Sequence, residues 1–360
     1  MKKLSILLLA ACSLTLFSCS KDDDNGGNSN EDFNTLKATV LTDFAAKTGL
    51  PGYSDLKEKA TTLNNAITAL NSSATDANLT AAQTAWRDMR STWEQCEGYL
   101  FGPVEDDNYD PNMDTWPVDY VQMDSLLASN NPLELSDIEN LSTLSLRGYH
   151  PIEYILWGKD GKRTAAAITD RQKQYITSLS QDLVNICTSL YNSWAPDGGN
   201  FANKVQTAGS GSSVFTKKQD AYIAIVEGLI GICDEVGSGK MKEPYDAQDP
   251  KIVESPFSGN SAIDFKNNIT GAYNVYTCKF LGNEGNGLNK LVAMKNLSLD
   301  NEIQQQFQAA IASFNSITLP YEQAILTQRV QCQNTMNAID ALKTTLEEKL
   351  KPFILTNITD

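Results

Sequence analysis

The sequence predicts an all-α protein of two helical-bundle domains, of the up-and-down type, with long ordered loops. Apolar residues recur at three- and four-residue steps over long stretches, as on one face of an amphipathic helix. Strict alternation of apolar and polar residues, the pattern of a strand, is almost absent. The 360 residues suffice for two domains that each bury a core. We therefore expect a first bundle over residues 31–160 and a second over residues 161–360.

The chain begins with the pattern of a secretory signal. Two lysines precede an apolar run over residues 4–17 that is too short to cross a bilayer. Leu16-Phe17-Ser18-Cys19 is typical of a bacterial lipobox, which predicts a signal peptide over residues 1–18 and lipidation of Cys19. The polar, glycine-rich residues 19–30 predict a flexible tether. Through the lipid on Cys19, the lipid bilayer is the expected partner of the chain. The alternative is an ordinary signal with an incidental cysteine.

A Lys21-Asp22-Asp23 run follows this cysteine closely. It resembles the surface-export signal of Bacteroidetes lipoproteins. The resemblance implies an outer-membrane lipoprotein, with the cell surface favoured over the periplasmic face.

Three long helices are predicted in the first bundle. The first stops around Gly49-Leu-Pro-Gly52, because glycine and proline end helices. A polar run predicts a loop over residues 71–80, and Gly102-Pro103 ends the third helix. The acidic stretch 105–119 predicts an ordered loop without helix. The long helices span residues 31–48, about 55–70 and about 81–99, and two short ones span about 118–129 and 135–143.

The second bundle is predicted to contain five helices. An irregular segment over residues 237–256 interrupts them, and long loops inside compact domains are often functional. The predicted helices span about residues 169–194, 217–236, 262–280, 300–314 and 321–350.

The charge balance argues against nucleic acids and anionic lipid headgroups as partners. The chain has 44 acidic and 29 basic residues and a formal net charge of −15. Such an excess repels nucleic acids and anionic lipid headgroups. It is compatible with attraction of cations, although most acidic surfaces serve solubility alone.

The chain's single histidine, His150, is the centre of the candidate site. Glu153 follows three residues later, so on a helix both side chains lie on one face and can bind a common ion. Pro151 predicts that a helix begins there with His150 as its N-cap, or that a helix kinks there, and Gly148 would ease the kink. The alternative is a capping or core histidine that is hydrogen-bonded to a carbonyl.

Gly148-Tyr-His-Pro-Ile-Glu153 matches the Gly-x-His-x-x-Glu motif of imelysin-like proteins, the insulin-cleaving membrane protease family, which also includes iron-regulated proteins. The resemblance implies a pair of helical bundles with the motif near their interface. Further stretches resemble the family in the same order along the chain: Trp86–Arg90, Glu97–Pro103, Trp116–Asp119, and Glu254–Ser258 followed by Asp264-Phe265.

The candidate ligands are those that a divalent or ferric ion prefers, with iron favoured and zinc possible. His150, Glu153 and Glu97 supply one imidazole and two carboxylates. Glu97 begins a Glu-Gly-Tyr-Leu-Phe-Gly segment whose spacing repeats that of the segment from Glu153 to Gly158. Five more residues are expected to support the site: Asp119 orients His150, Arg90 pairs with the acids, and, by the resemblance, Glu254, Ser255 and Ser258 close over the cleft.

Three hypotheses follow for the function. The first is a cell-envelope lipoprotein that binds a metal ion, iron favoured, or an iron-carrying partner in the cleft between the bundles, in iron uptake. The second is a metal-dependent peptidase that uses His150 and Glu153 as ligands and takes a peptide as its partner. A single histidine departs from the common ligand sets of zinc peptidases. In the third, the motif only joins the two bundles.

Overall fold

The computed structural model describes residues 29–359, and the fold is all-α as predicted. Among the described residues the strands are confined to one antiparallel hairpin, β1 (Lys279–Phe280) with β2 (Asn283–Glu284). The predicted signal peptide and Cys19 lie outside the described residues, as does the tether up to residue 28. Within residues 29–359, no helix combines the length and apolar character needed to cross a membrane.

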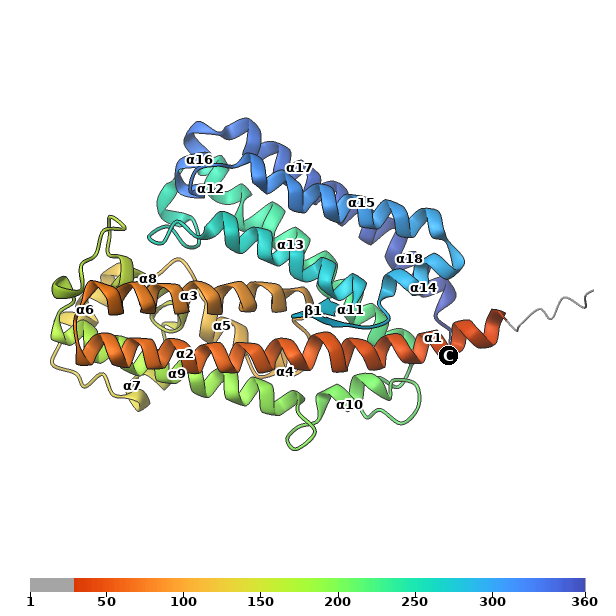
Figure 1. Ribbon diagram of the computed structural model, residues 1–360, viewed down its shortest axis with the longest axis horizontal. Helices are drawn as coiled ribbons and strands as arrows, with labels where there is room; N and C mark the ends of the chain where they lie inside the picture. The colour runs from red at the N-terminus through yellow and green to blue at the C-terminus, as the bar shows by residue number, and fades with distance from the viewer. Residues whose placement is uncertain (1–28, 360) are drawn as a thin grey trace, which may run out of the picture.

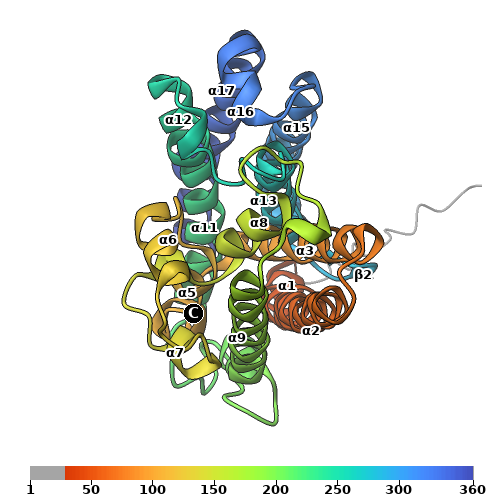
Figure 2. The same cartoon turned by 90° about the vertical axis from the view of Figure 1, so that its left-hand side faces the viewer.

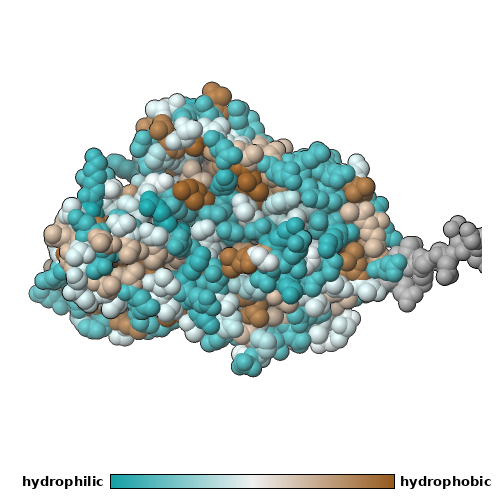
Figure 3. Space-filling view, viewed as in Figure 1, coloured by the Kyte–Doolittle hydropathy of each residue, from teal (hydrophilic) through white to brown (hydrophobic). Residues whose placement is uncertain are grey.

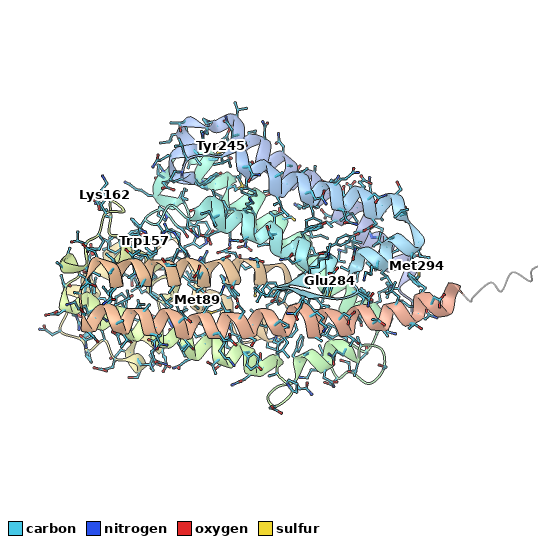
Figure 4. All side chains as sticks on the ribbon, in the orientation of Figure 1. Met89, Trp157, Lys162, Tyr245, Glu284 and Met294 are labelled. Atoms are coloured by element: carbon cyan, nitrogen blue, oxygen red, sulfur yellow. The ribbon has the colours of Figure 1, made fainter. Side chains whose placement is uncertain are left out.

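The helices form two layers, which Figure 1 shows one above the other. In the lower layer α2 lies against α3 and α9, and Figure 2 shows these three helices nearly end-on. Figure 4 shows Met89, a buried residue of α3, between the α2 and α3 ribbons. The helices of this layer are α1 (Ser29–Asp43), α2 (Leu50–Ser72), α3 (Asp76–Cys96), α4 (Pro103–Asp106), α5 (Tyr109–Asp114), α6 (Tyr120–Ala128), α7 (Leu135–Glu139), α8 (Tyr149–Trp157), α9 (Asp170–Trp194) and α10 (Phe201–Gln206).

The upper layer is formed by the carboxyl-terminal part of the chain. Here α15 lies against α17, and α11 packs on both α13 and α17. The main contact between the layers is that of α13 with α3. The helices are α11 (Lys218–Asp234), α12 (Lys242–Ala247), α13 (Ser261–Thr277), α14 (Leu288–Lys295), α15 (Leu297–Ser313), α16 (Tyr321–Thr327), α17 (Arg329–Thr345) and α18 (Lys351–Asn357).

Short turns of other helical types extend these helices. The π-helical turns are η1 (Phe44–Gly49), η5 (Glu235–Lys240) and η8 (Leu346–Leu350). The 3-10 turns are η2 (Glu97–Tyr99), η3 (Leu144–Leu146), η4 (Ala165–Ala167), η6 (Pro250–Ile252) and η7 (Phe314–Ser316).

The lower layer extends past the residue at which we expected a boundary. Helix α9, which begins at Asp170, packs along α2, and α10 lies against α1. The first group of helices therefore runs to Gln206. Whether the two layers are independent domains stays a prediction.

The predicted stop at Gly49-Leu-Pro-Gly52 is wrong, because the chain stays helical from Ser29 to Ser72. The π-helical turn η1 absorbs the proline: the Leu50 amide donates to the Ala45 carbonyl, five residues back. The glycines serve packing. A Cβ on Gly49 would lie 2.7 Å from the Trp194 ring, and one on Gly52 would lie 2.1 Å from the Tyr99 hydroxyl. Two aromatic side chains thus lie directly on the helix backbone.

Three predicted loops are partly helical. Helix α3 begins at Asp76, because the Thr75 hydroxyl accepts from the Asn78 amide and caps it. The acidic stretch 105–119 includes all of α5 and the end of α4, and the segment 237–256 includes α12, η6 and part of η5. Conversely, the helix predicted over residues 321–350 is interrupted at Gln328, between α16 and α17. These short helices lack the periodic apolar face on which the prediction depends.

Candidate metal centre

The site is built on the face of α3 that points toward the upper layer. Arg90 and Glu94 lie one turn apart on this face, and Glu97 follows at the helix end. Two tryptophans of α3 hold the neighbouring elements in place. The Trp86 indole donates to the Tyr149 carbonyl of α8 over 3.0 Å, and the Trp93 indole donates to Asp114 Oδ2 of α5 over 2.7 Å.

Gly148 brings α5 and α8 into backbone contact. A Cβ on Gly148 would lie 1.8 Å from the Met113 carbonyl oxygen, and the residue has φ +75°, which glycine adopts readily. The next residues along each chain are therefore neighbours: Asp114 ends α5, and His150 lies in the first turn of α8. This is the role of the glycine in the motif. The prediction that a helix begins at Pro151 with His150 as its N-cap is wrong, because α8 begins at Tyr149 and Gly148 is the N-cap. The alternative, a kink at Pro151, stays a prediction.

His150 is buried between two carboxylates. Its Nε2 lies 2.9 Å from Asp114 Oδ1, and its Nδ1 lies 3.9 Å from Glu153 Oε2. Burial lowers the pKa of the imidazole, but the two carboxylates raise it more, to about 9. His150 and Glu153 share one helix face, as their spacing predicts. His150 is thus held by side chains, and the carbonyl-bonded alternative does not describe it.

Glu153 connects α8 to the loop that precedes α13. Its Oε1 accepts from the Phe257 amide (3.1 Å), the Ser258 amide (2.8 Å) and the Ser258 hydroxyl (2.7 Å). Its Oε2 has no hydrogen-bond partner although it is buried. One oxygen therefore holds the loop, and the other stays available.

Arg90 is fully buried and contacts acids from three directions. Its guanidinium pairs with Asp114 and Glu94, and it donates to Glu254 Oε1 over 2.8 Å. Asp264 Oδ2 lies 3.8 Å away. Arg90 therefore pairs with several buried acids of the cluster.

Lys240, at the end of η5, is a second buried cation that the sequence analysis missed. Its ammonium lies 3.0 Å from Glu97 Oε2, 3.3 Å from Glu254 Oε1 and 3.5 Å from Glu94 Oε2. Burial lowers its pKa, but these acids and Glu235 raise it well above the usual value. The lysine is therefore charged. No sequence signal identifies it, because it lies in a segment predicted to be irregular.

Together these residues form a charge cluster in which acids outnumber cations. Two permanent cations and His150 face six buried carboxyl groups: Glu94, Glu97, Asp114, Glu153, Glu254 and Asp264. Burial raises the pKa of Glu97 and Asp264 well above the usual range, and that of Glu254 to about 7. Burial also raises the pKa of Asp114, but Arg90 and then His150 lower it below its usual value. Burial thus favours the protonated form of Glu97, Glu254 and Asp264.

Two groups of this cluster have ligand atoms close enough to hold an ion. Asp114, His150 and Glu254 form one group, and Glu94, Glu97 and Asp114 form the other, with the atoms of each group within 4.8 Å of one another. The structure thus brings His150 together with Glu254, which was expected only to support the site. Glu97 belongs to the second group, and Glu153 is engaged by the loop.

Asp114 takes the part that was predicted for Asp119. Asp119 is exposed and caps α6 by accepting from the Gln122 amide over 2.9 Å, so it does not orient His150. Asp114 lies in the acidic stretch 105–119, so the composition marked the segment but not the residue.

The loop residues take the places expected of them. Ser258 donates to Glu153, and Ser255 donates to Asp264 Oδ2 over 2.8 Å, so Ser255 is engaged away from His150. The site is closed, however, and the predicted open cleft is not present at these residues: His150 is 2% exposed and Glu254 is 2% exposed. Four surface hollows along residues 29–359 are lined by other side chains.

Comparison with known proteins identifies the family. The sequence profile of Imelysin matches residues 49–350. The chain belongs to the imelysin family. It is 31% identical over 320 residues to iron-regulated protein A of Synechococcus elongatus, and the match covers 88% of this chain and 86% of that protein. It is therefore a homologue of iron-regulated protein A.

Two solved structures share the imelysin fold. A crystal structure assigned to an iron-regulated protein A precursor from Parabacteroides distasonis has a TM-score of 0.80 at 25% identity, with 91% of this chain and 95% of that chain covered. The crystal structure of an imelysin-like protein from Psychrobacter arcticum has a TM-score of 0.72 at 14% identity, with 91% and 98% covered. In this imelysin family member, the buried Asp, His and Glu group could hold a metal ion.

Proposed function

We propose that this protein is a cell-envelope lipoprotein of iron uptake that binds a metal ion at Asp114, His150 and Glu254, with iron favoured and zinc second. The names of its relatives refer to iron, and the geometry supplies one imidazole and two carboxylates in a single group. That ligand set suits iron and zinc. An iron-carrying partner is the alternative ligand of the same site.

One observation carries the proposal: three buried ligand atoms around His150 have no hydrogen-bond partner, namely His150 Nδ1, Glu153 Oε2 and Glu254 Oε2. The first two lie 3.9 Å apart, which is too far for a hydrogen bond, so they attract each other only as an ion pair. Buried polar atoms are almost always paired, and leaving one unpaired costs about 1 to 3 kcal/mol. A bound cation would pair such atoms and would also offset the excess negative charge of the buried acids.

The residues present determine what loading requires. His150 carries a proton at neutral pH, because its pKa is about 9, and it must release that proton to bind an ion. Arg90 holds Asp114 and Glu254 in place, so it would remain beside the ion and limit the positive charge that the group accepts.

Anchoring at the outer membrane, with the cell surface favoured, is part of the proposal. Its support is the lipobox ending in Cys19 and the Lys-Asp-Asp run after it. The peptidase alternative has weaker support, because Glu153 is bonded to the loop before α13 and His150 is almost inaccessible to a peptide.

The test is calorimetric titration of the mature protein with Fe²⁺ without oxygen, and with Zn²⁺. We expect the wild type to bind and His150→Ala to lose at least about tenfold in affinity, as removal of one metal ligand predicts. Asp119→Asn is the matched control and should bind as the wild type does, because Asp119 is bonded to Gln122 and belongs to neither ligand group. Circular dichroism checks that both variants fold. Equal binding by wild type and His150→Ala, or no binding by either, would refute the proposal.

A further inference from the structure

Lys240 is surrounded by carboxylate oxygens. Four carboxylate oxygens, from Glu94, Glu97, Glu235 and Glu254, lie within 3.5 Å of its single nitrogen. An ammonium has three N–H groups, so it cannot donate to all four. The surroundings thus supply more acceptors than a lysine can use, and three of the four acids are fully buried.

The acids around Lys240 include most of the second ligand group. That group consists of Glu94, Glu97 and Asp114, and Asp114 also belongs to the His150 group. One carboxylate therefore adjoins two possible ion positions. Arg90 and Lys240 provide the positive charge at this junction: Arg90 pairs with Asp114, and Lys240 pairs with Glu97.

The side-chain amide of Asn268 lies between the same two carboxylates. Asn268 is fully buried, and its Nδ2 donates to Glu94 Oε2 over 2.6 Å and also to Glu97 Oε2. Its Oδ1 has no hydrogen-bond partner. Rotation of the amide would exchange the two atoms and present an oxygen, a ligand that hard cations prefer, to the space between the two carboxylates.

We propose that Glu94, Glu97 and Asp114 form a second divalent-cation position, bridged to the His150 position by the Asp114 carboxylate, and that the Lys240 ammonium occupies it when no ion is bound. This inference rests on the proposed function, because it adds a second ion to the same centre. The second position has oxygen ligands only, whereas the first has a nitrogen.

The turn that carries Lys240 gives the side chain a place to move to. Residues Glu235 and Lys240 are the ends of η5, a π-helical turn of a kind that occurs often at functional sites. The Glu235 side chain is 48% exposed and lies 3.4 Å from the Lys240 ammonium. An entering ion can therefore displace the ammonium from Glu97 toward Glu235 and the solvent while it keeps one partner. Glu235 and Lys240 thus mark the side of the cluster from which the ion enters.

The experiment is titration of the mature protein with Mn²⁺, a divalent ion suited to carboxylate ligands, with stoichiometry by calorimetry and coupling by electron paramagnetic resonance. We expect one ion to bind through His150 and a second to bind at least about tenfold more weakly, because it competes with Lys240. Lys240→Met should tighten the second ion by about tenfold or more. Glu97→Gln should abolish the second ion and leave the affinity for the first unchanged.

Each outcome distinguishes this inference from the proposed function. A spin-coupled spectrum at two ions per chain, lost in Glu97→Gln, supports the bridged pair. A single ion in the wild type and in Lys240→Met, lost in His150→Ala, overturns the second position and leaves the proposed function standing. No binding at all overturns both. If Lys240→Met does not fold, the comparison of wild type with Glu97→Gln decides, because a second ion that survives Glu97→Gln also overturns the inference.

Discussion

Arg90 is the residue on which the buried acids of the lower and upper layers converge. It contacts Asp114 and Glu94 from one layer and Glu254 from the other, and it is completely buried. Removing one partner of such a network leaves uncompensated charges in a medium of low dielectric constant, which costs about 3 to 5 kcal/mol.

We therefore expect Arg90→Met to lower the free energy of unfolding by about 3 to 5 kcal/mol, measured by denaturant unfolding of the metal-free protein. Arg87→Met, one turn earlier on α3, is the matched control. Arg87 is only half-buried and contacts the Ser258 carbonyl and the Trp157 ring, so its loss should cost clearly less. Equal losses for the two variants would contradict this account of the cluster.

Glu322 predicts a pH-dependent stability. Burial raises the pKa of this carboxyl from 4.5 to about 7, and its Oε2 has no partner. Between these values the folded protein keeps a proton that the unfolded chain releases, so the free energy of unfolding falls as the pH rises from about 4.5 to about 7.

Glu322→Gln should therefore be more stable than the wild type at pH 8 by roughly 1 to 2 kcal/mol, and equally stable at pH 4. Thermal unfolding at both pH values measures the difference. The exposed Glu348→Gln is the control and should show no such gain. A Glu322→Gln variant without a gain at pH 8 would show that this carboxyl is solvated.

Individual residues were predictable where a local pattern identified them. The spacing of His150 and Glu153 placed both on one helix face, and the loop serines were placed by resemblance to the family. Asp114 and Lys240 were missed because their importance depends on contacts between segments distant in sequence. Asp119 was chosen because it follows a tryptophan and a proline that match the family, yet its side chain caps a helix at the surface.

At the scale of elements, replacing a glycine by alanine should have opposite effects on stability in two helices. A Cβ on Gly52 of α2 would lie 2.1 Å from the Tyr99 hydroxyl and 3.0 Å from Cys96 Sγ, whereas a Cβ on Gly231 of α11 would meet nothing within 4 Å. We expect Gly52→Ala to destabilise the protein by about 1 to 3 kcal/mol through overpacking. Gly231→Ala should stabilise it by roughly 0.5 to 1 kcal/mol, because alanine favours the helix. Chemical denaturation of both variants decides, and two changes of the same sign would contradict the packing argument.

The segment Gly49–Gly52 shows why the helix boundaries were only partly predictable. Glycine and proline near Gly49 usually end a helix, and the sequence contains no sign that a π-helical turn accommodates them. The helix predicted over about residues 169–194 agrees with α9, which Thr169 caps through its side chain. Long amphipathic helices were therefore predictable, and short helices set by tertiary contacts were not.

For the whole molecule, Glu153 determines how closely the two layers associate at the site. Its Oε1 accepts three hydrogen bonds from the loop before α13. In Glu153→Ala these bonds are lost, so amide hydrogens of residues 253–260 should exchange at least about tenfold faster, while those of α2 and α9 keep their protection. Ser258→Ala removes one of the three bonds and should have a smaller effect. Hydrogen–deuterium exchange with mass spectrometry measures both, and unchanged exchange in Glu153→Ala would show that other contacts hold the loop.

Figure 3 shows a largely hydrophilic face with apolar side chains in small separate patches. The chain has a net charge of −15, and its acidic residues lie inside the molecule, in the cluster, as well as on the outside.

The closure of the site affects how fast an ion could come and go. With His150, Glu153 and Glu254 each at most 2% exposed, an ion at this centre leaves only when the loop of residues 253–260 or the turn at Lys240 opens. The residence time is then governed by the frequency of that opening as well as by affinity. Under the proposed function, such a centre would retain its ion through dilution, which suits delivery better than continuous sensing of the free ion.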